Sequence, residues 1–90
     1  MKKPSILIVD DEKNAREGLA RALQRQYDVK LADNGQTALD LLRAAPVDVV
    51  LSDVRMPGMD GLTLLQRAMT LSPQPVCIML TAYGSIEQAV

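Results

Sequence analysis

The chain has 90 residues and a mass of 9.8 kDa, which suits one small domain and is too little for two hydrophobic cores, so we expect a single domain over residues 1–90. Apolar residues make up 48% and charged residues 23% of the chain, which excludes a disordered segment and a low-complexity fibre. The net charge is -1, and no Phe or Trp is present to stack on bases, so direct binding to nucleic acid is not expected.

The apolar runs and the rarer residue types exclude further classes. Every apolar run is far shorter than the roughly 20 residues that a membrane span needs, and the first run is too short for the core of a signal peptide. We therefore expect a cytoplasmic protein with no membrane partner. One cysteine cannot form an internal disulfide, and the lack of histidine removes the commonest metal ligand and acid–base group. Any chemistry must therefore fall to carboxylates.

The first half of the chain predicts the order strand, helix, strand, helix. Residues 5–9 form a continuous apolar run, typical of a strand that is buried on both faces. A helix is expected from about Asn14, which together with Glu17 suits a capping box. Residues 27–32 alternate apolar and polar, as in a half-buried edge strand, and an Asn-Gly turn then leads into a second helix that Pro46 ends. Helical spacing predicts that the apolar face of the first helix consists of Ala15, Leu19, Ala22 and Leu23.

The second half repeats the same alternation. Residues 47–52 predict a second buried strand, and a Pro-Gly turn separates it from a third helix around residues 62–69. Two prolines prevent this helix from continuing, and residues 76–80 then predict a fourth strand. A last helix is expected to begin near Ser85. This alternation predicts an α/β fold with an open, doubly wound parallel sheet, and we expect the flavodoxin-like strand order 2-1-3-4(-5), in which the first and third strands are neighbours.

Polar residues follow three of the four predicted strands. Asp10 and Asp11 follow the first strand, Asp53 follows the third, and Thr81 follows the fourth. In a parallel sheet these ends meet at one edge, and ligands bind where the strand order reverses. Converging carboxylates repel one another, and a hard divalent cation is the simplest compensation, with Mg²⁺ the best fit. A carboxylate beside Mg²⁺ can accept a phosphoryl group while a hydroxyl such as that of Thr81 donates to the developing charge.

Three sequence blocks carry a family resemblance: Ile-Val-Asp-Asp-Glu at 8–12, Ser-Asp-Val-Arg-Met-Pro-Gly-Met-Asp-Gly at 52–61, and Leu-Thr-Ala at 80–82. They occur in order, each at the end of its own predicted strand. With them the chain resembles the receiver domain of a bacterial two-component response regulator. The segments 53–61 and 81–90 look most like the nitrogen-regulation type of enhancer-binding transcription activators, which work with sigma-54.

The resemblance implies specific roles for these residues. Asp53 would accept a phosphoryl group from a sensor histidine kinase, and the domain would catalyse its own phosphorylation and dephosphorylation without being a conventional enzyme. Asp11 and Asp53 would hold Mg²⁺ together with the backbone carbonyl of Arg55, and Asp10 would act mainly through a water molecule. Thr81 would move towards the phosphoryl group and switch a downstream effector. In relatives of this type the effector is an ATPase and DNA-binding portion, of which this chain holds no residue.

The chain departs from the family at its C-terminal end. The family has a fifth strand with an essential Lys and a fifth helix, and no lysine of this chain matches that position. We therefore expect a receiver domain cut short at Val90. The fourth strand would then form an apolar sheet edge, and such edges recruit other strands, so the 90-residue chain is expected to self-associate.

Two alternatives stay open from the sequence. One is an Mg²⁺-dependent phosphohydrolase with an aspartyl nucleophile, although such enzymes have two acids spaced two residues apart after the first strand, whereas Asp10 and Asp11 are adjacent. The other is a protein-interaction module on the same fold that is never phosphorylated. The intact set of acids argues against this second alternative.

Overall fold

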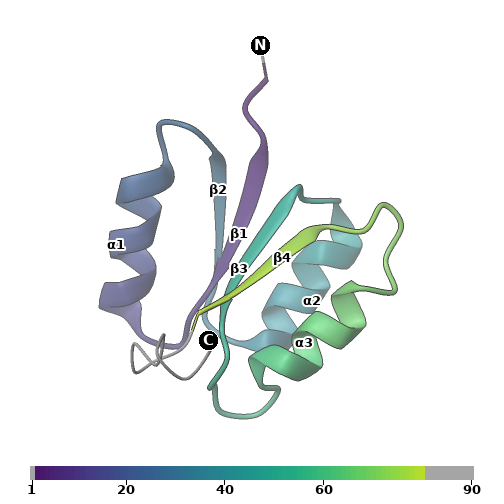
Figure 1. Ribbon diagram of the computed structural model, residues 1–90. Helices are drawn as coiled ribbons and strands as arrows, with labels where there is room; N and C mark the ends of the chain where they lie inside the picture. The colour runs from purple at the N-terminus through teal and green to yellow at the C-terminus, as the bar shows by residue number, and fades with distance from the viewer. Residues whose placement is uncertain (1, 81–90) are drawn as a thin grey trace, which may run out of the picture.

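A computed structural model of the chain describes residues 2–80 and shows an open α/β sheet (Figure 1). All strand pairs are parallel, and the strand order is β2-β1-β3-β4. The predicted fold class and strand order are therefore confirmed for this part of the chain. The elements are β1 (Ser5–Val9), α1 (Lys13–Leu23), β2 (Asp28–Ala32), α2 (Gly35–Ala44), β3 (Val49–Asp53), α3 (Gly61–Ala68) and β4 (Val76–Leu80).

The helices cover both faces of the sheet, with α1 on one face and α2 and α3 on the other (Figure 1). Successive side chains of a strand point to opposite faces, and β1 supplies both cores. Leu7 and Val9 belong to the larger core, which α2 and α3 close, while Ile6 and Ile8 belong to the smaller core beneath α1. A strand covered in this way must be apolar throughout, which explains the continuous run in the sequence.

The strand register brings the ends of the central strands together. Val9, the last residue of β1, pairs with Ala32 of β2 and with Ser52 of β3. Asp53, the last residue of β3, pairs with Leu80 of β4. The residues that follow β1 and those that end β3 therefore lie side by side at the C-terminal ends of the strands.

The start and the apolar face of α1 differ from the sequence prediction. The helix begins at Lys13, one residue earlier than expected, and its N-cap residue Glu12 makes no side-chain capping bond. The carbonyl of Glu12 already accepts the first intrahelical bond, from the Arg16 amide at 3.0 Å, so the predicted capping box falls inside the helix and is wrong. The residues that pack on the sheet are Leu19, Ala20 and Leu23, whereas Ala15 and Ala22 are exposed, because the side of α1 that faces β1 and β2 is rotated from the predicted stripe.

The caps of α2 and α3 explain why these helices begin where they do. Asn34 accepts a hydrogen bond from the Thr37 amide at 2.8 Å, which confirms that the Asn-Gly pair is a strand-to-helix turn. Asp60 accepts one from the Thr63 amide, also at 2.8 Å. Hydrogen bonds from the amide and from the side chain of Thr63 lower the pKa of Asp60 below its ordinary value of 3.8.

One edge of the four-stranded sheet is formed by β4. Its outward-facing side chains, Val76, Ile78 and Leu80, are 63%, 47% and 37% exposed, and they lie on the face of the sheet that α1 covers elsewhere. Cys77 points to the other face and packs against the larger core. Within residues 2–80, no helix combines the length and the apolar character needed to traverse a lipid bilayer. Thr81 and the helix expected near Ser85 lie outside the described residues.

Candidate functional site

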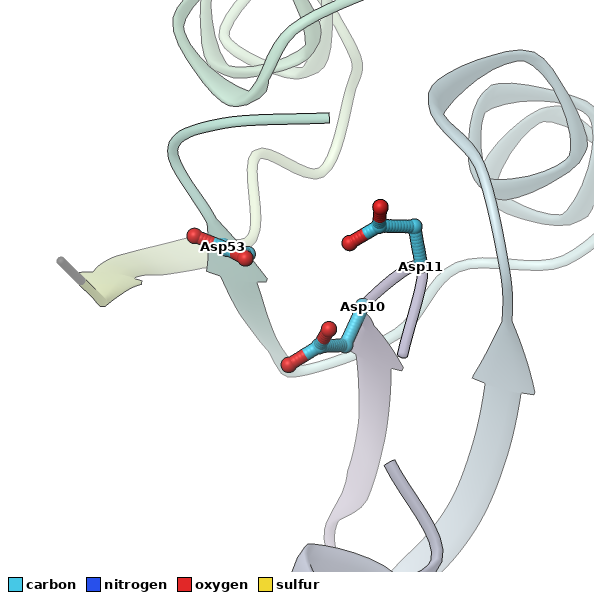
Figure 2. A group of neighbouring side chains, drawn as sticks. All are labelled: Asp10, Asp11 and Asp53. Atoms are coloured by element: carbon cyan, nitrogen blue, oxygen red, sulfur yellow. The ribbon is translucent and has the colours of Figure 1, made fainter. Parts of the chain in front are cut away.

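Three carboxylates meet at the C-terminal ends of the neighbouring strands β1 and β3. Asp10 and Asp11 follow the tip of β1, and Asp53 ends the neighbouring strand β3, so the three side chains lie together beyond the ends of these paired strands (Figure 2). One oxygen from each carboxylate lies within 4.8 Å of the others. Asp10 is buried, Asp53 is half-buried and Asp11 is exposed. The structure thus confirms the predicted convergence of these acids and leaves the cluster open to solvent on the side of Asp11.

Asp10 is the most tightly held of the three. Its amide donates to the Ala32 carbonyl at 3.1 Å, which continues the pairing with β2 by one residue. Its Oδ1 accepts from the Glu12 amide at 2.9 Å, and its own carbonyl accepts from Arg16 Nη1 at 2.9 Å. These bonds fix the main chain at Asp10, and with it the direction in which the neighbouring Asp11 side chain leaves the strand.

Asp53 is held by the loop that follows it. Its Oδ1 accepts from the Arg55 amide at 3.2 Å, and its carbonyl accepts from the Ser52 hydroxyl at 2.9 Å. The next residue, Val54, continues the pairing with β4 by donating to Leu80 at 3.0 Å. The Val54 carbonyl then accepts from the Gly61 amide at 2.8 Å, which closes the loop back onto its own strand.

Gly61 is a residue of the site that the sequence analysis did not single out. A Cβ atom at this position would overlap the carbonyl oxygen of Asp53 and would lie 2.9 Å from the Cα atom of Val54. The first residue of α3 therefore presses directly against the main chain of Asp53, and only glycine fits. The Asp-Gly pair at 60–61 was visible in the sequence, but only the packing of α3 against β3 shows which backbone it approaches.

Metal-binding chemistry is well matched by this set of donors. All the candidate ligand atoms are carboxylate oxygens of Asp side chains, which suit a hard divalent cation such as Mg²⁺. Asp11 is exposed, so water molecules can complete the coordination shell on that side. The amide of Arg55 donates a hydrogen bond to Asp53, which places the Arg55 main chain beside the cluster. The role of the Arg55 carbonyl as a metal ligand stays a prediction. Thr81, the predicted phosphoryl contact, follows β4 directly and lies outside the described residues.

The parallel sheet in the order β2-β1-β3-β4 and its edge cluster of three acids define a class of signalling domain. The family model for the response regulator receiver domain matches residues 6–90, and the chain belongs to this family. The acidic cluster stands at the typical receiver metal site.

Curated relatives place the chain more narrowly. It is 44% identical over 86 residues to the regulatory protein AtoC of Escherichia coli, covering 94% of this chain and 19% of that protein. It is 37% identical over 91 residues to the DNA-binding transcriptional regulator NtrC of the same species, covering 100% of this chain and 19% of that protein. Both are activators of the sigma-54 type, and the chain spans about a fifth of their length.

Solved structures match the chain as a receiver fold. The chemotaxis response regulator CheY4 of Vibrio cholerae superposes with a TM-score of 0.85 at 33% identity, covering 97% of this chain and 75% of that one. The signal receiver domain of an HD domain-containing protein of Pseudomonas fluorescens gives 0.82 at 34% identity, covering 98% and 74%.

Proposed function

We propose that this chain receives a signal as a phosphoryl group on Asp53, transferred from a sensor histidine kinase with Mg²⁺. The observation that carries the proposal is the meeting of Asp10, Asp11 and Asp53 within 4.8 Å at the open edge of the sheet, in a chain of the receiver family. Asp53 ends a central strand and is half-buried, so a phosphoryl group on it adds charge to a fixed position in the fold.

The proposed transfer is a substitution at phosphorus. A carboxylate oxygen of Asp53 forms the new P–O bond while the P–N bond to the kinase histidine breaks, and the imidazole leaves with the electron pair of that bond. When bound, Mg²⁺ supplies positive charge that offsets the negative charge on the phosphoryl oxygens. Asp11 and Asp53 would be its carboxylate ligands, Arg55 would offer its backbone carbonyl, and Asp10 would act through a water molecule.

The Arg55 amide supports the assignment of Asp53 as acceptor. It already donates to Oδ1 of Asp53 at 3.2 Å, so this oxygen is oriented in the resting domain and Oδ2 is left for the incoming phosphorus. Asp10 is buried whereas Asp53 is half-buried, so Asp53 is the more accessible of the two to a phosphodonor, and burial suits Asp10 better to holding a cation.

The proposed output is a shift between an inactive and an active conformation, with Thr81 contacting the phosphoryl group. We further propose, from the family resemblance, a cytoplasmic effector that regulates transcription through an ATPase and a DNA-binding portion; the relative NtrC is itself a DNA-binding transcriptional regulator. The exposed apolar side chains of β4 support the further proposal that the 90-residue chain self-associates.

The experiment is phosphorylation by a small phosphodonor, acetyl phosphate, followed by intact-protein mass spectrometry with and without Mg²⁺. A version of the chain that continues past residue 90 into the family's Lys-bearing strand is the sample of choice. One added phosphoryl group is expected with Mg²⁺, and none after Asp53→Asn. Asp40→Asn is the matched control, because Asp40 is an exposed acid on α2 whose contact with Gln36 an Asn side chain retains.

The same experiment decides between the proposal and its two alternatives. Continuous release of inorganic phosphate without a stable adduct indicates a phosphohydrolase with an aspartyl nucleophile. Neither adduct nor turnover indicates a protein-interaction module that is not phosphorylated. An adduct that persists in Asp53→Asn means that another acid is the acceptor.

A further inference from the structure

Arg16 connects α1 to the acidic cluster. It lies in the first turn of α1, and its side chain runs back towards the N-terminal end of the helix, as long helical side chains do. Its Nη1 donates to the main-chain carbonyl of Asp10 at 2.9 Å, and Arg16 is half-buried in doing so. The other cations of α1, Lys13 and Arg21, are exposed.

The position of this carbonyl explains why the contact matters. The pairing of β1 with both neighbours ends at Val9, and the Asp10 amide adds one last bond to Ala32. The Asp10 carbonyl lies just beyond the sheet ladder, at the peptide that joins Asp10 to Asp11. Arg16 supplies the donor for this carbonyl, so its guanidinium fixes the peptide between two of the three acids.

We propose that Arg16 is a positioning residue for the acidic cluster, setting the main chain at Asp10 so that the carboxylates of Asp10 and Asp11 keep their distance from Asp53. The inference rests on the proposed function for the metal itself, since a cation bound by all three acids depends on that distance. The contact goes to a main-chain oxygen that does not titrate, so the geometry, and not the neutralisation of a carboxylate, is what Arg16 contributes.

Removing Arg16 has two effects of opposite sign on Mg²⁺ binding. The loss of a nearby positive charge strengthens binding, and the loss of the anchor weakens it. Salt separates the two, because the Debye length falls from about 10 Å at 0.1 M to about 3 Å at 1 M. At high salt the charge effect is largely screened and the effect of the anchor is what is measured.

The experiment is titration calorimetry of the 90-residue chain with Mg²⁺ in about 1 M KCl, a salt level at which the Debye length is about 3 Å. Arg16→Met should bind Mg²⁺ about 10-fold more weakly than the unchanged chain, a typical loss when a group that orients a metal ligand is removed. Arg21→Met removes an equal charge from the same helix and should bind within about twofold of the unchanged chain, since only screened charge is lost. Arg16→Lys, which keeps a cationic donor, should lie between them.

A second measurement needs no metal. The Glu12 amide donates to Oδ1 of Asp10, so its hydrogen exchange reports on the order of this turn. Exchange should be several-fold faster in Arg16→Met than in Arg21→Met, while the exchange of the β1 amides stays the same. A role in overall stability alone would raise exchange throughout the sheet and leave the affinity for Mg²⁺ unchanged.

The outcomes separate this inference from the proposed function. If the unchanged chain binds no Mg²⁺, the proposed metal site is wrong, and the Glu12 exchange still decides whether Arg16 orders the turn. If the unchanged chain binds Mg²⁺ and Arg16→Met binds it equally well at high salt, with Glu12 exchange unaltered, Arg16 does not position the cluster. If Arg16→Met does not fold, the same comparison is made with Arg16→Lys, whose loss of affinity must then exceed that of Arg21→Met.

Discussion

Replacing Gly61 with alanine tests whether the close contact between α3 and the main chain of Asp53 is essential. The new Cβ would lie 2.9 Å from the Cα atom of Val54, whereas an ordinary contact needs at least 3.4 Å, so Val54 must recede by about 0.5 Å. The carbonyl oxygen of Asp53 must move further still, since the Cβ atom overlaps it. Both obstacles are backbone atoms in or next to a central strand, so no flexible side chain can yield instead.

The cost follows from these displacements. Overpacking a well-filled interior costs about 1–3 kcal/mol, and the upper end applies here because backbone has to shift. For a domain of this size each kcal/mol lowers the melting temperature by about 4–8 °C, so we expect a fall of about 10–20 °C. The same shift moves the Asp53 carboxylate away from its partners, and Mg²⁺ affinity should fall with it.

The assay is thermal and urea denaturation of Gly61→Ala beside Gly18→Ala. Gly18 lies inside α1, and a Cβ there meets nothing within 4 Å, so this control should gain about 1 kcal/mol from helix propensity. Each of the two substitutions adds one methyl group to a helix, and the two are expected to shift stability in opposite directions. A Gly61→Ala protein as stable as the unchanged chain would refute the close contact.

Three further predictions concern the cluster, the α3 cap and the β4 edge. Asp11→Asn should weaken Mg²⁺ binding in titration calorimetry and leave the metal-free fold at least as stable, because a repelling charge is removed; unchanged affinity would remove Asp11 from the ligand set. Asp60 should stabilise the fold above pH 3.8 and lose this contribution as the pH falls through its lower folded pKa. The free energy of unfolding of the unchanged chain and that of Asp60→Ala should therefore converge in acid, whereas a difference that does not change with pH would show that the charged cap does not stabilise the fold. Ile78→Lys should reduce self-association in light scattering, whereas equal association would place the contact elsewhere.

The fold was largely predictable because the strands obey simple patterns. The apolar run at 5–9 is typical of a strand covered on both faces, and the helical spacing between the strands favours parallel crossovers. With the first and third strands as neighbours, that topology brings Asp10 and Asp53 together at the strand ends, which is why the cluster was predicted. The start of α1 was not predicted correctly. The first intrahelical bond goes to the carbonyl of Glu12, a main-chain group, so the helix begins before the residues of the predicted capping box.

The supporting residues of the site were the part that the sequence could not reveal. Gly61 matters through its approach to the backbone of Asp53, and Arg16 through a bond to a main-chain carbonyl. Main-chain groups carry no residue-specific signal, so contacts with them leave no pattern in the sequence. The exposure of alternate residues along β4 likewise depends on which strand stands at the edge of the sheet.

The central claim is that Asp53 accepts the phosphoryl group, and mapping the modified residue tests it most directly. After acetyl phosphate and Mg²⁺, borohydride reduction converts an aspartyl phosphate into homoserine, which peptide mass spectrometry locates in the chain. The account predicts homoserine at position 53 only, and none when Mg²⁺ is withheld. Homoserine at position 10 or 11, or at no position in a chain that binds Mg²⁺, would contradict it.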